Sequence, residues 1–250
     1  DLGPRCRGGQ GMAAPGAARH PFVGGAGVGL DIGGAKTHAV LVSPTGDNPA
    51  QERLLTGPGG LEALATALCA TRRVLAIGGV EASALSGIGV GVPGTVDHVR
   101  GVVTQALNLG VEHMPLAEQL SEVFARPVHV ENDVNAAALG VALLDGAAGL
   151  RPVAAGGDVA QAPAAQAPAA QEAAPSLAYL NLGTGLAVGL VLDGALWRGA
   201  RGAAGEIGHL PLDPQGPVCH CGQRGCLETM ASGSGIAHQW RVARSDPPPK

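Results

Sequence analysis

The chain has 250 residues, of which 46% are hydrophobic and 2% aromatic, and its formal net charge is −4 at pH 7. This length fits one large or two modest domains, with a core built mainly from aliphatic side chains and alanine. The acidic balance and the lack of a basic stripe argue against nucleic acid as a partner. No apolar run reaches the roughly 18 residues of a membrane span, so the sequence also argues against a membrane protein.

The first half of the chain reads as an N-terminal α/β lobe. Residues 1–24 are rich in Gly, Pro and Ala without a period, and we expect a disordered lead-in there. The lobe is expected over 25–148, with a first helix whose core-facing side carries Leu61, Leu64, Ala65, Leu68 and Cys69. Apolar runs and turn residues predict strands over 28–32, 38–42, 51–55, 85–92 and 127–130, and helices over 61–69, 116–124 and 134–144.

The second half repeats the opening pattern. Residues 149–176 are a low-complexity Ala/Pro/Gln stretch, which we expect to be a flexible insertion. A C-terminal lobe follows over 177–250, with strands predicted at 179–182, 186–192 and 195–198 and a hairpin turn at Asp193-Gly194. Each half therefore runs strand, Gly-rich turn, strand, hairpin, strand. Such a duplication predicts two similar α/β lobes with a cleft between them. Trp197 and Trp240 are expected to be packing residues.

A cluster of cysteines dominates the C-terminal half. His209, Cys219, Cys221 and Cys226 lie within eighteen positions, with glycines between them. These residue types suit a closed tetrahedral zinc site, and four protein ligands make the metal structural, because a catalytic zinc keeps one position open. The alternative is a set of free thiols on a surface loop. The cysteine usage favours a reducing, cytoplasmic compartment over a disulfide scaffold.

Two Gly-rich turns, one in each half, suit a bound phosphate chain. Glycine lets backbone N–H groups approach anionic oxygens without a Cβ in the way. In the first turn Asp31 could hold Mg²⁺ through water and Lys36 adds positive charge, and in the second Thr184 offers a hydroxyl. The alternative is that both are tight turns without a ligand.

Asn132 and Asp133 follow a predicted strand and precede a predicted helix. Polar groups at such a place face the ligand site of many α/β folds, and a carboxylate there could accept a proton from a substrate hydroxyl during phosphoryl transfer. The alternative is that Asp133 only caps the helix over 134–144.

Several motifs of the chain are shared with a known family. They are the segments 31–36, 89–97, 131–133, 182–185 and 205–209, together with the cysteine cluster. These segments resemble the ROK family (repressor, open reading frame, kinase) of sugar kinases and sugar-responsive repressors, from about residue 28 to about residue 236. The resemblance implies the two-lobed, duplicated α/β fold of actin and hexokinase, which is ribonuclease H-like, with a zinc-clamped loop. Family members continue past the point where this chain ends, so we expect a truncated C-terminal lobe.

The resemblance also assigns roles to individual residues. It makes Asp133 the catalytic base and His209 both a zinc ligand and a sugar contact. The sugar-binding set is Gly94, Asn108, Asn132, Asp133, Glu206, His209 and Glu228. The ATP-phosphate set is Asp31, Gly33, Gly34, Lys36, Gly183, Thr184 and Gly185. The metal set is His209, Cys219, Cys221 and Cys226.

The function implied is that of an ATP-dependent, glucokinase-like sugar kinase. Its partners would be a hexose and Mg²⁺-ATP, with structural Zn²⁺, and the resemblance makes a homodimer the expected assembly. Two alternatives remain: a sugar-sensing transcriptional regulator with the same sugar-binding body, and a catalytically inactive, truncated homologue.

Overall fold

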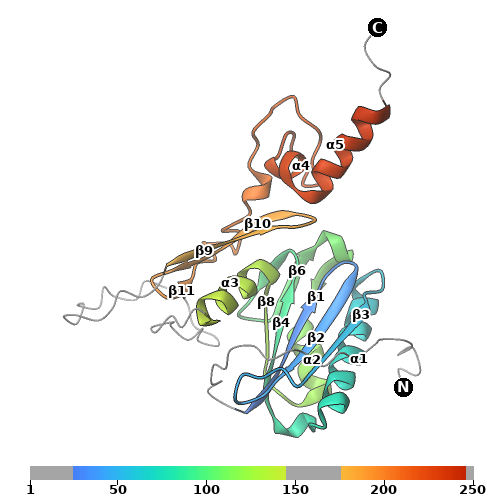
Figure 1. Ribbon diagram of the computed structural model, residues 1–250, viewed down its shortest axis with the longest axis vertical. Coiled ribbons are helices and arrows are strands. Elements are labelled where there is room, and N and C mark those ends of the chain that lie inside the picture. The colour runs from blue at the N-terminus through green and yellow to red at the C-terminus, as the bar shows by residue number, and fades with distance from the viewer. Residues whose placement is uncertain (1–24, 145–175, 246–250) are drawn as a thin grey trace, which may run out of the picture. The chain divides into compact units, whose positions relative to one another are not determined.

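The computed structural model describes residues 25–144 and 176–245 (Figure 1). The expected lead-in over 1–24 and nearly all of the expected insertion over 149–176 lie outside the described residues. The described chain forms two compact units, and the division falls inside one helix, between Ala136 and Ala137. The second unit therefore begins with the end of that helix and continues from residue 176.

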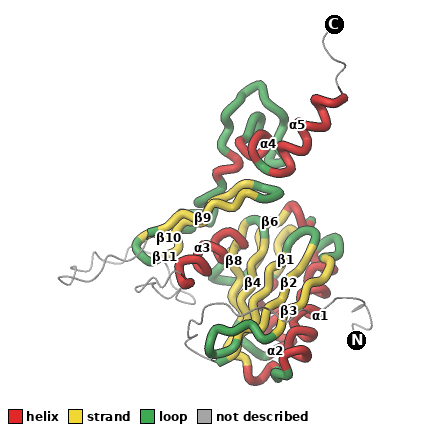
Figure 2. Tube along the Cα trace, viewed as in Figure 1, coloured by secondary structure: helices red, strands yellow, loops and turns green. Residues whose placement is uncertain are grey.

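The first unit is built on a five-stranded mixed sheet (Figure 2). In spatial order its strands are β3 (Ala50–Leu55), β2 (Lys36–Val42), β1 (Ala26–Ile32), β4 (Leu85–Val92) and β8 (Val128–Asn132). The strands β1, β2 and β3 pair antiparallel, whereas β1, β4 and β8 run parallel. All five strands predicted for this half are confirmed, although β8 extends two residues further than expected.

Two helices cover this sheet, and one of them, α1, buries small residues against it. The helix α1 (Gly60–Gly78) packs on β2 and β3, and α2 (Leu116–Phe124) packs on β8. The buried stripe of α1 runs through Ala63, Ala67 and Ala70, whose small side chains let the helix lie close to the strands. The prediction was wrong for Leu61, which is 84% exposed. That residue lies in the first turn, on the side away from the stripe.

A second, small sheet of the first unit has no counterpart in the sequence prediction. Its three antiparallel strands are β5 (Thr95–Asp97), β6 (Val102–Ala106) and β7 (Val111–Met114), in the order β5-β6-β7. The strands are three to five residues long and are interrupted by turns, so no alternation of polar and apolar residues lasts long enough to be recognised. Val103 and Val111 nevertheless belong to the main hydrophobic core.

The second unit carries the predicted repeat of the opening strands. A three-stranded antiparallel sheet has the order β11 (Ala195–Leu196), β10 (Leu186–Leu192), β9 (Leu177–Leu182). Asp193 and Gly194 have φ values of 50° and 73°, and positive φ at both central residues is what a type I′ hairpin turn requires. The helix α3 (Asp133–Leu144) contributes Ala138 and Ala142 to the core of this unit, where they join Val191.

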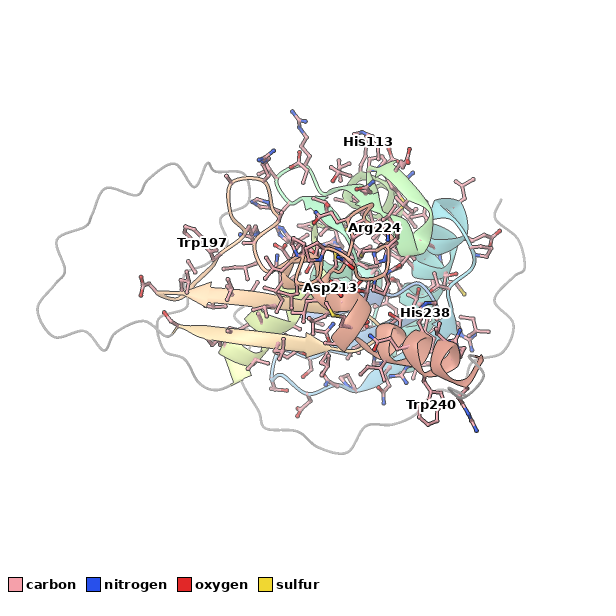
Figure 3. All side chains as sticks on the ribbon, turned by 90° about the horizontal axis from the view of Figure 1, so that it is seen from above. His113, Trp197, Asp213, Arg224, His238 and Trp240 are labelled. Atoms are coloured by element: carbon pink, nitrogen blue, oxygen red, sulfur yellow. The ribbon has the colours of Figure 1, made fainter. Side chains whose placement is uncertain are left out.

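The second unit ends in two helices that the sequence prediction did not include, α4 (Leu227–Ala231) and α5 (Gly233–Ser245). Within the two described ranges, none of the helices has both the length and the apolar character that a membrane crossing demands. The packing role predicted for the tryptophans was wrong. Trp197 is 54% exposed and Trp240 on α5 is 64% exposed, and both side chains point away from the ribbon in Figure 3. Arg244, one turn further along α5, lies 5.4 Å over the Trp240 ring.

An ion pair between α1 and β3 gives the first testable prediction. The carboxylate of Glu52 has no exposed surface and its Oε1 lies 3.2 Å from Nε of Arg73. Arg73→Ala leaves this charge buried without its cation and is expected to lower the free energy of unfolding by about 3–5 kcal/mol. Chemical denaturation measures the change. Arg72→Ala on the exposed side of the same helix is the control, and equal effects of the two variants would contradict the prediction.

Candidate functional site

The predicted site residues of the first unit gather at one edge of its sheet. Because β1, β4 and β8 are parallel, their carboxyl ends meet at the same edge, which is where α/β folds bind ligands. The Gly33-Gly34 turn follows β1, Gly94 follows β4 by two residues, and Asp133 directly follows β8. The segments that the sequence predicts to bind phosphate, to bind sugar and to accept a proton therefore lie at the same edge of the sheet.

The first Gly-rich turn is closed by its own backbone and lies against Asn108. The N–H of Gly33 donates to the carbonyl oxygen of Lys36 at 2.9 Å. A Cβ on Gly34 would stand 2.9 Å from the carbonyl oxygen of Asn108, which is closer than real Cβ atoms approach backbone. Glycine at position 34 thus allows the short helical turn Leu107–Leu109, which carries Asn108, to pack against the first Gly-rich turn.

Asn132 is predicted to be a sugar ligand, and in the structure its side chain makes hydrogen bonds to backbone groups of the protein. Its Nδ2 donates to the carbonyl oxygen of Gly94 at 3.1 Å, and its Oδ1 accepts from the N–H groups of Val134 and Asn135 at 3.0 and 3.1 Å. Asn132 is therefore the side chain that caps the start of α3. Asp133, for which capping was the alternative reading, accepts from the Val134 N–H at 2.9 Å.

Two further residues, Glu131 and Asn135, support the start of α3, and the sequence analysis gave neither of them a role. Oε1 of Glu131 accepts from Nδ2 of Asn135 at 3.2 Å and from the backbone N–H of Asn132 at 3.1 Å. Asn135 is buried. The available signal was a lone amide at the start of the apolar, Ala-rich run 134–144, since an amide that becomes buried requires a partner.

Electrostatics distinguish Asp133 from an ordinary surface carboxylate. Burial raises the pKa of Asp133 above 3.8; the Val134 N–H opposes this shift and the negative charge of Asp31 adds to it. Desolvation likewise raises the pKa of Asp31, against the attraction of His38 and Arg53. The two carboxylates are thus close enough to interact, and each holds its proton more tightly than a free aspartate does.

The raised pKa of Asp133 predicts a pH-dependent gain in stability when its charge is removed. A carboxyl group with a folded-state pKa above the unfolded value opposes folding once it ionises, so its favourable contribution exists below about pH 3.8 and is lost as the pH rises through the folded pKa. Asp133→Asn should therefore raise Tm at pH 7, and the gain should vanish as the pH falls below 4. Thermal unfolding across that range measures it, and a pH-independent difference would contradict it.

The second Gly-rich turn, at Gly183–Gly185, is fixed by α5. The Gly183 N–H donates to the Gly185 carbonyl oxygen at 3.0 Å. From the other side, the Gly233 N–H donates to the Gly183 carbonyl oxygen at 2.8 Å, and Oγ of Ser234 donates to the Thr184 carbonyl oxygen at 2.7 Å. Ser234 was not singled out from the sequence, although it lies in the alternating Ser-Gly run at 232–235.

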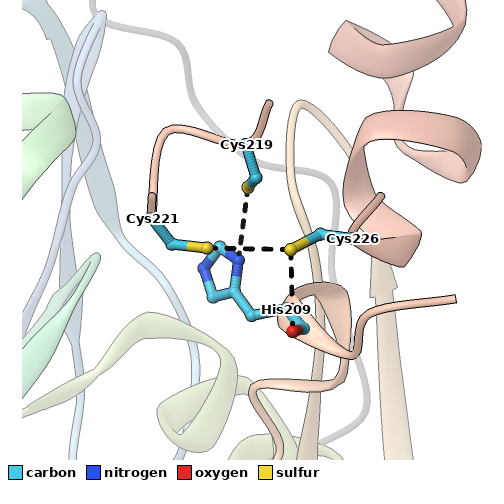
Figure 4. A group of neighbouring side chains, drawn as sticks. All are labelled: His209, Cys219, Cys221 and Cys226. Carbon is cyan, nitrogen blue, oxygen red and sulfur yellow. Dashed lines mark hydrogen bonds between the residues drawn. The ribbon is translucent and has the colours of Figure 1, made fainter. Parts of the chain in front are cut away.

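The four predicted metal ligands come together in one cluster (Figure 4). Their ligand atoms all lie within 4.8 Å of one another. Sγ of Cys219 is 3.6 Å from Nδ1 of His209, and Sγ of Cys221 is 3.7 Å from Sγ of Cys226. A tetrahedral zinc with ordinary bond lengths separates two sulfurs by about 3.8 Å and a sulfur from a nitrogen by about 3.6 Å. The observed separations fit such an ion.

The burial of the thiols also fits a cation. Cys219 and Cys226 are buried, and Cys221 is exposed. Burial raises the pKa of the Cys226 thiol to about 12, and the neighbouring Cys221 and Cys219 add to the shift. A divalent cation beside these sulfurs would favour the thiolate form that metal ligation requires. Zn²⁺ is the ion that three thiolates and one imidazole suit best.

Two acidic residues, Glu206 and Glu228, lie next to histidines of the cluster loop. Nε2 of His209, the ring nitrogen opposite the cluster, lies 4.0 Å from Oε2 of Glu206. Oε1 of Glu228 lies 3.6 Å from Nε2 of His220, and Oε2 of Glu228 accepts from the Leu186 N–H at 3.0 Å. His220, which the sequence analysis left without a role, thus contacts Glu228. Its position between two metal ligands was the available signal.

Comparison with known proteins places these features in one family. The model of the ROK family matches residues 27–155 and 150–250. A glucokinase of Halalkalibacterium halodurans is 33% identical over 213 residues, which cover 84% of this chain and 57% of the glucokinase. A putative xylose repressor of a Caldicellulosiruptor species is 37% identical over 146 residues, covering 58% of this chain and 31% of the repressor.

Solved structures agree with this grouping. A ROK family glucokinase from Streptomyces griseus, crystallised with glucose and AMPPNP, is 30% identical with a TM-score of 0.69, and the match covers 88% of this chain and 62% of that one. The chain thus spans less than two thirds of the length of these relatives. It has the α/β fold of the actin and hexokinase type found in ROK sugar kinases. On its motifs, its fold and these matches, the chain belongs to the ROK family.

Proposed function

We propose that the chain acts in the ATP-dependent phosphorylation of a hexose, as a glucokinase does. The observation that carries the proposal is the position of Asp133, at the same carboxyl edge of the sheet as the Gly33-Gly34 turn. A carboxylate held there with a raised pKa can accept a proton near neutral pH better than a free aspartate can. The glucokinase relatives support the choice of sugar and ATP.

In the proposed reaction a sugar hydroxyl oxygen attacks the γ-phosphorus of ATP. The new bond joins that oxygen to phosphorus, the bond to the β-phosphate oxygen breaks, and ADP leaves. Asp133 accepts the proton that the hydroxyl loses. Mg²⁺, when bound with ATP, would neutralise phosphate charge, which is most of what this chemistry requires of a catalyst. Asp31 is the residue proposed to hold it through water.

The two Gly-rich turns are proposed to bind the phosphates. Gly33 and Gly34 with Lys36 would serve one turn, and Gly183, Thr184 and Gly185 the other. In both turns the backbone is fixed by hydrogen bonds before any ligand arrives, which reduces the entropy lost on binding.

The residues proposed to bind the sugar are Glu206, His209 and Glu228 in the second unit and Gly94, Asn108 and Asn132 in the first unit. Zn²⁺ would be held by Cys219, Cys221, Cys226 and Nδ1 of His209. This leaves Nε2 of His209 available for a sugar hydroxyl or for Glu206. The proposal includes a cytoplasmic location, where ATP and free hexoses meet, and a homodimeric assembly.

A sugar-dependent release of ADP tests the proposal. Purified chain is incubated with Mg²⁺-ATP and, separately, with glucose, mannose, fructose, N-acetylmannosamine and N-acetylglucosamine. We expect at least one sugar to raise the rate of ADP release well above the sugar-free rate. A rate that no sugar changes would contradict the proposal.

The repressor relatives favour a second candidate, a sugar-sensing regulator that binds sugar without phosphorylating it. Calorimetric titration with the same sugars separates the two functions. Sugar binding accompanied by ADP release supports the kinase, whereas sugar binding without ADP release, under conditions where ATP is present, supports the regulator.

A further inference from the structure

We infer that Glu228 is a positioning residue that transmits the state of the metal cluster to the second phosphate-binding turn. The inference rests on the proposed function, because it concerns the turn proposed for ATP. It goes beyond the sugar-binding role proposed for Glu228, since it assigns the carboxylate a second task inside the protein. The turn, the metal cluster, α4 and α5 all belong to the second unit.

The carboxylate of Glu228 is tied to the metal cluster at two points. Glu228 is the second residue of α4, and the residue before that helix is the ligand Cys226. Its Oε1 also lies 3.6 Å from Nε2 of His220, which stands between the ligands Cys219 and Cys221. Ordering of the loop by a metal therefore fixes both the backbone that carries Glu228 and a side chain that contacts its carboxylate.

The other oxygen of Glu228 holds the end of the turn. Oε2 accepts the Leu186 N–H at 3.0 Å, and Leu186 directly follows Gly185. This side chain is largely buried, with 13% of it exposed, so water competes little for the hydrogen bond from Leu186. Leu186 is the first residue of β10, so this hydrogen bond joins Glu228 to the place where the Gly-rich turn becomes a strand.

Glycines at two positions make this close approach possible. A Cβ on Gly185 would lie 2.8 Å from Oε2 of Glu228, and a Cβ on Gly208 would lie 3.2 Å from Cβ of Glu228. The first of these glycines belongs to the turn and the second precedes the ligand His209. Glu228 thus fills space that is free because the turn and the metal loop each have a glycine, without a side chain, at the point of contact.

The start of the same turn, at Gly183 and Thr184, is held by the first residues of α5. Gly233 and Ser234 bond the carbonyl oxygens of Gly183 and Thr184, and they follow Glu228 by five and six residues. A Cβ on Gly233 would lie 2.8 Å from the Gly183 carbonyl oxygen. The turn is therefore held between Glu228 and the start of α5, and both belong to the chain segment that begins at Cys226.

Backbone hydrogen exchange tests the inference without sugar, ATP or turnover. We expect removal of the metal by a chelator to raise the exchange rate of the Leu186 amide by about tenfold or more, the loss expected for one charge-assisted hydrogen bond. The Trp197 amide, which donates to the Leu190 carbonyl oxygen at 2.7 Å in the same sheet, is the internal control and should change much less.

Two variants separate positioning from general damage. Glu228→Ala should raise the exchange of Leu186 in the metal-loaded protein, whereas Glu228→Gln keeps an oxygen acceptor of the same reach and should restore protection. In parallel, the affinity for a non-hydrolysable ATP analogue should fall about tenfold or more for Glu228→Ala and much less for Glu228→Gln.

The outcomes distinguish this inference from the proposed function. Unchanged Leu186 exchange after metal removal, or equal exchange in the Ala and Gln variants, would overturn the inference even if the protein phosphorylates sugars. Conversely, a Leu186 exchange rate that depends on both the metal and Glu228 supports the inference even if no sugar is phosphorylated. In that case the proposed function is contradicted and the inference is not.

Discussion

Asp133→Asn is expected to lower the rate of sugar phosphorylation by about 10²–10⁴-fold, with sugar affinity nearly unchanged. The amide cannot accept the hydroxyl proton as the O–P bond forms, but it keeps the size of the carboxylate and an oxygen for the Val134 N–H. Initial rates of ADP release at saturating sugar and ATP measure the first effect, and calorimetric titration of the sugar measures the second.

The control for this variant is Asp193→Asn. Asp193 lies in the hairpin turn between β10 and β11 with a φ of 50°, a conformation that asparagine tolerates as well as aspartate does. This variant loses the same charge and should keep the full rate. An Asp133→Asn protein that retains a rate within a few fold of the original would show that Asp133 is not the base.

Cys221→Ser is expected to reduce bound zinc from about one ion per chain to well below one, with a loss of sugar affinity. A serine hydroxyl replaces a thiolate poorly, and the remaining three ligands leave the buried Cys219 and Cys226 thiols without a full tetrahedron. We also expect Tm to fall by at least about 5 °C, since the loss of a metal site is among the large effects of single substitutions.

Elemental analysis by mass spectrometry measures the zinc content, and calorimetry measures Tm and sugar affinity. Gln223→Ser in the same loop is the matched control, because the Gln223 side chain is exposed and it is the backbone carbonyl oxygen of Gln223 that accepts from the Cys219 N–H at 2.7 Å. A Cys221→Ser protein with undiminished zinc, or a metal-free protein with unchanged sugar affinity, would contradict the structural role of the metal.

The sequence predicts the large sheets because their strands repeat one pattern. In both halves an apolar strand, a Gly-rich turn and a second strand follow one another, and the antiparallel pairing of β1 with β2 and of β9 with β10 results. The small sheet β5-β6-β7 escapes prediction since its strands are too short to show a period. The helix α4, with five residues, escapes for the same reason, and its position depends on the metal loop before it.

The sequence predicts the metal ligands of the candidate site but not the contacts that support them, and the reason is physical. Ligand types can be read from residue chemistry, so the sequence identifies the four members of the metal cluster, and the structure brings them together. The contacts that hold these ligands and the Gly-rich turns in place cannot be read in the same way, because they depend on which parts of the folded chain meet in space. The bond from Leu186 to Glu228 and the contact of His220 with Glu228 join residues whose pairing no local pattern encodes.

Transfer of a labelled phosphoryl group tests the kinase proposal most directly. The chain is incubated with Mg²⁺-ATP carrying ¹⁸O on the γ-phosphate and with a mixture of hexoses and N-acetylhexosamines, and the sugars are analysed by mass spectrometry. The account predicts a sugar phosphate that retains the label, formed by the unaltered chain and almost absent with Asp133→Asn. Labelled inorganic phosphate without any labelled sugar phosphate, or no consumption of ATP while sugar binds, would contradict it.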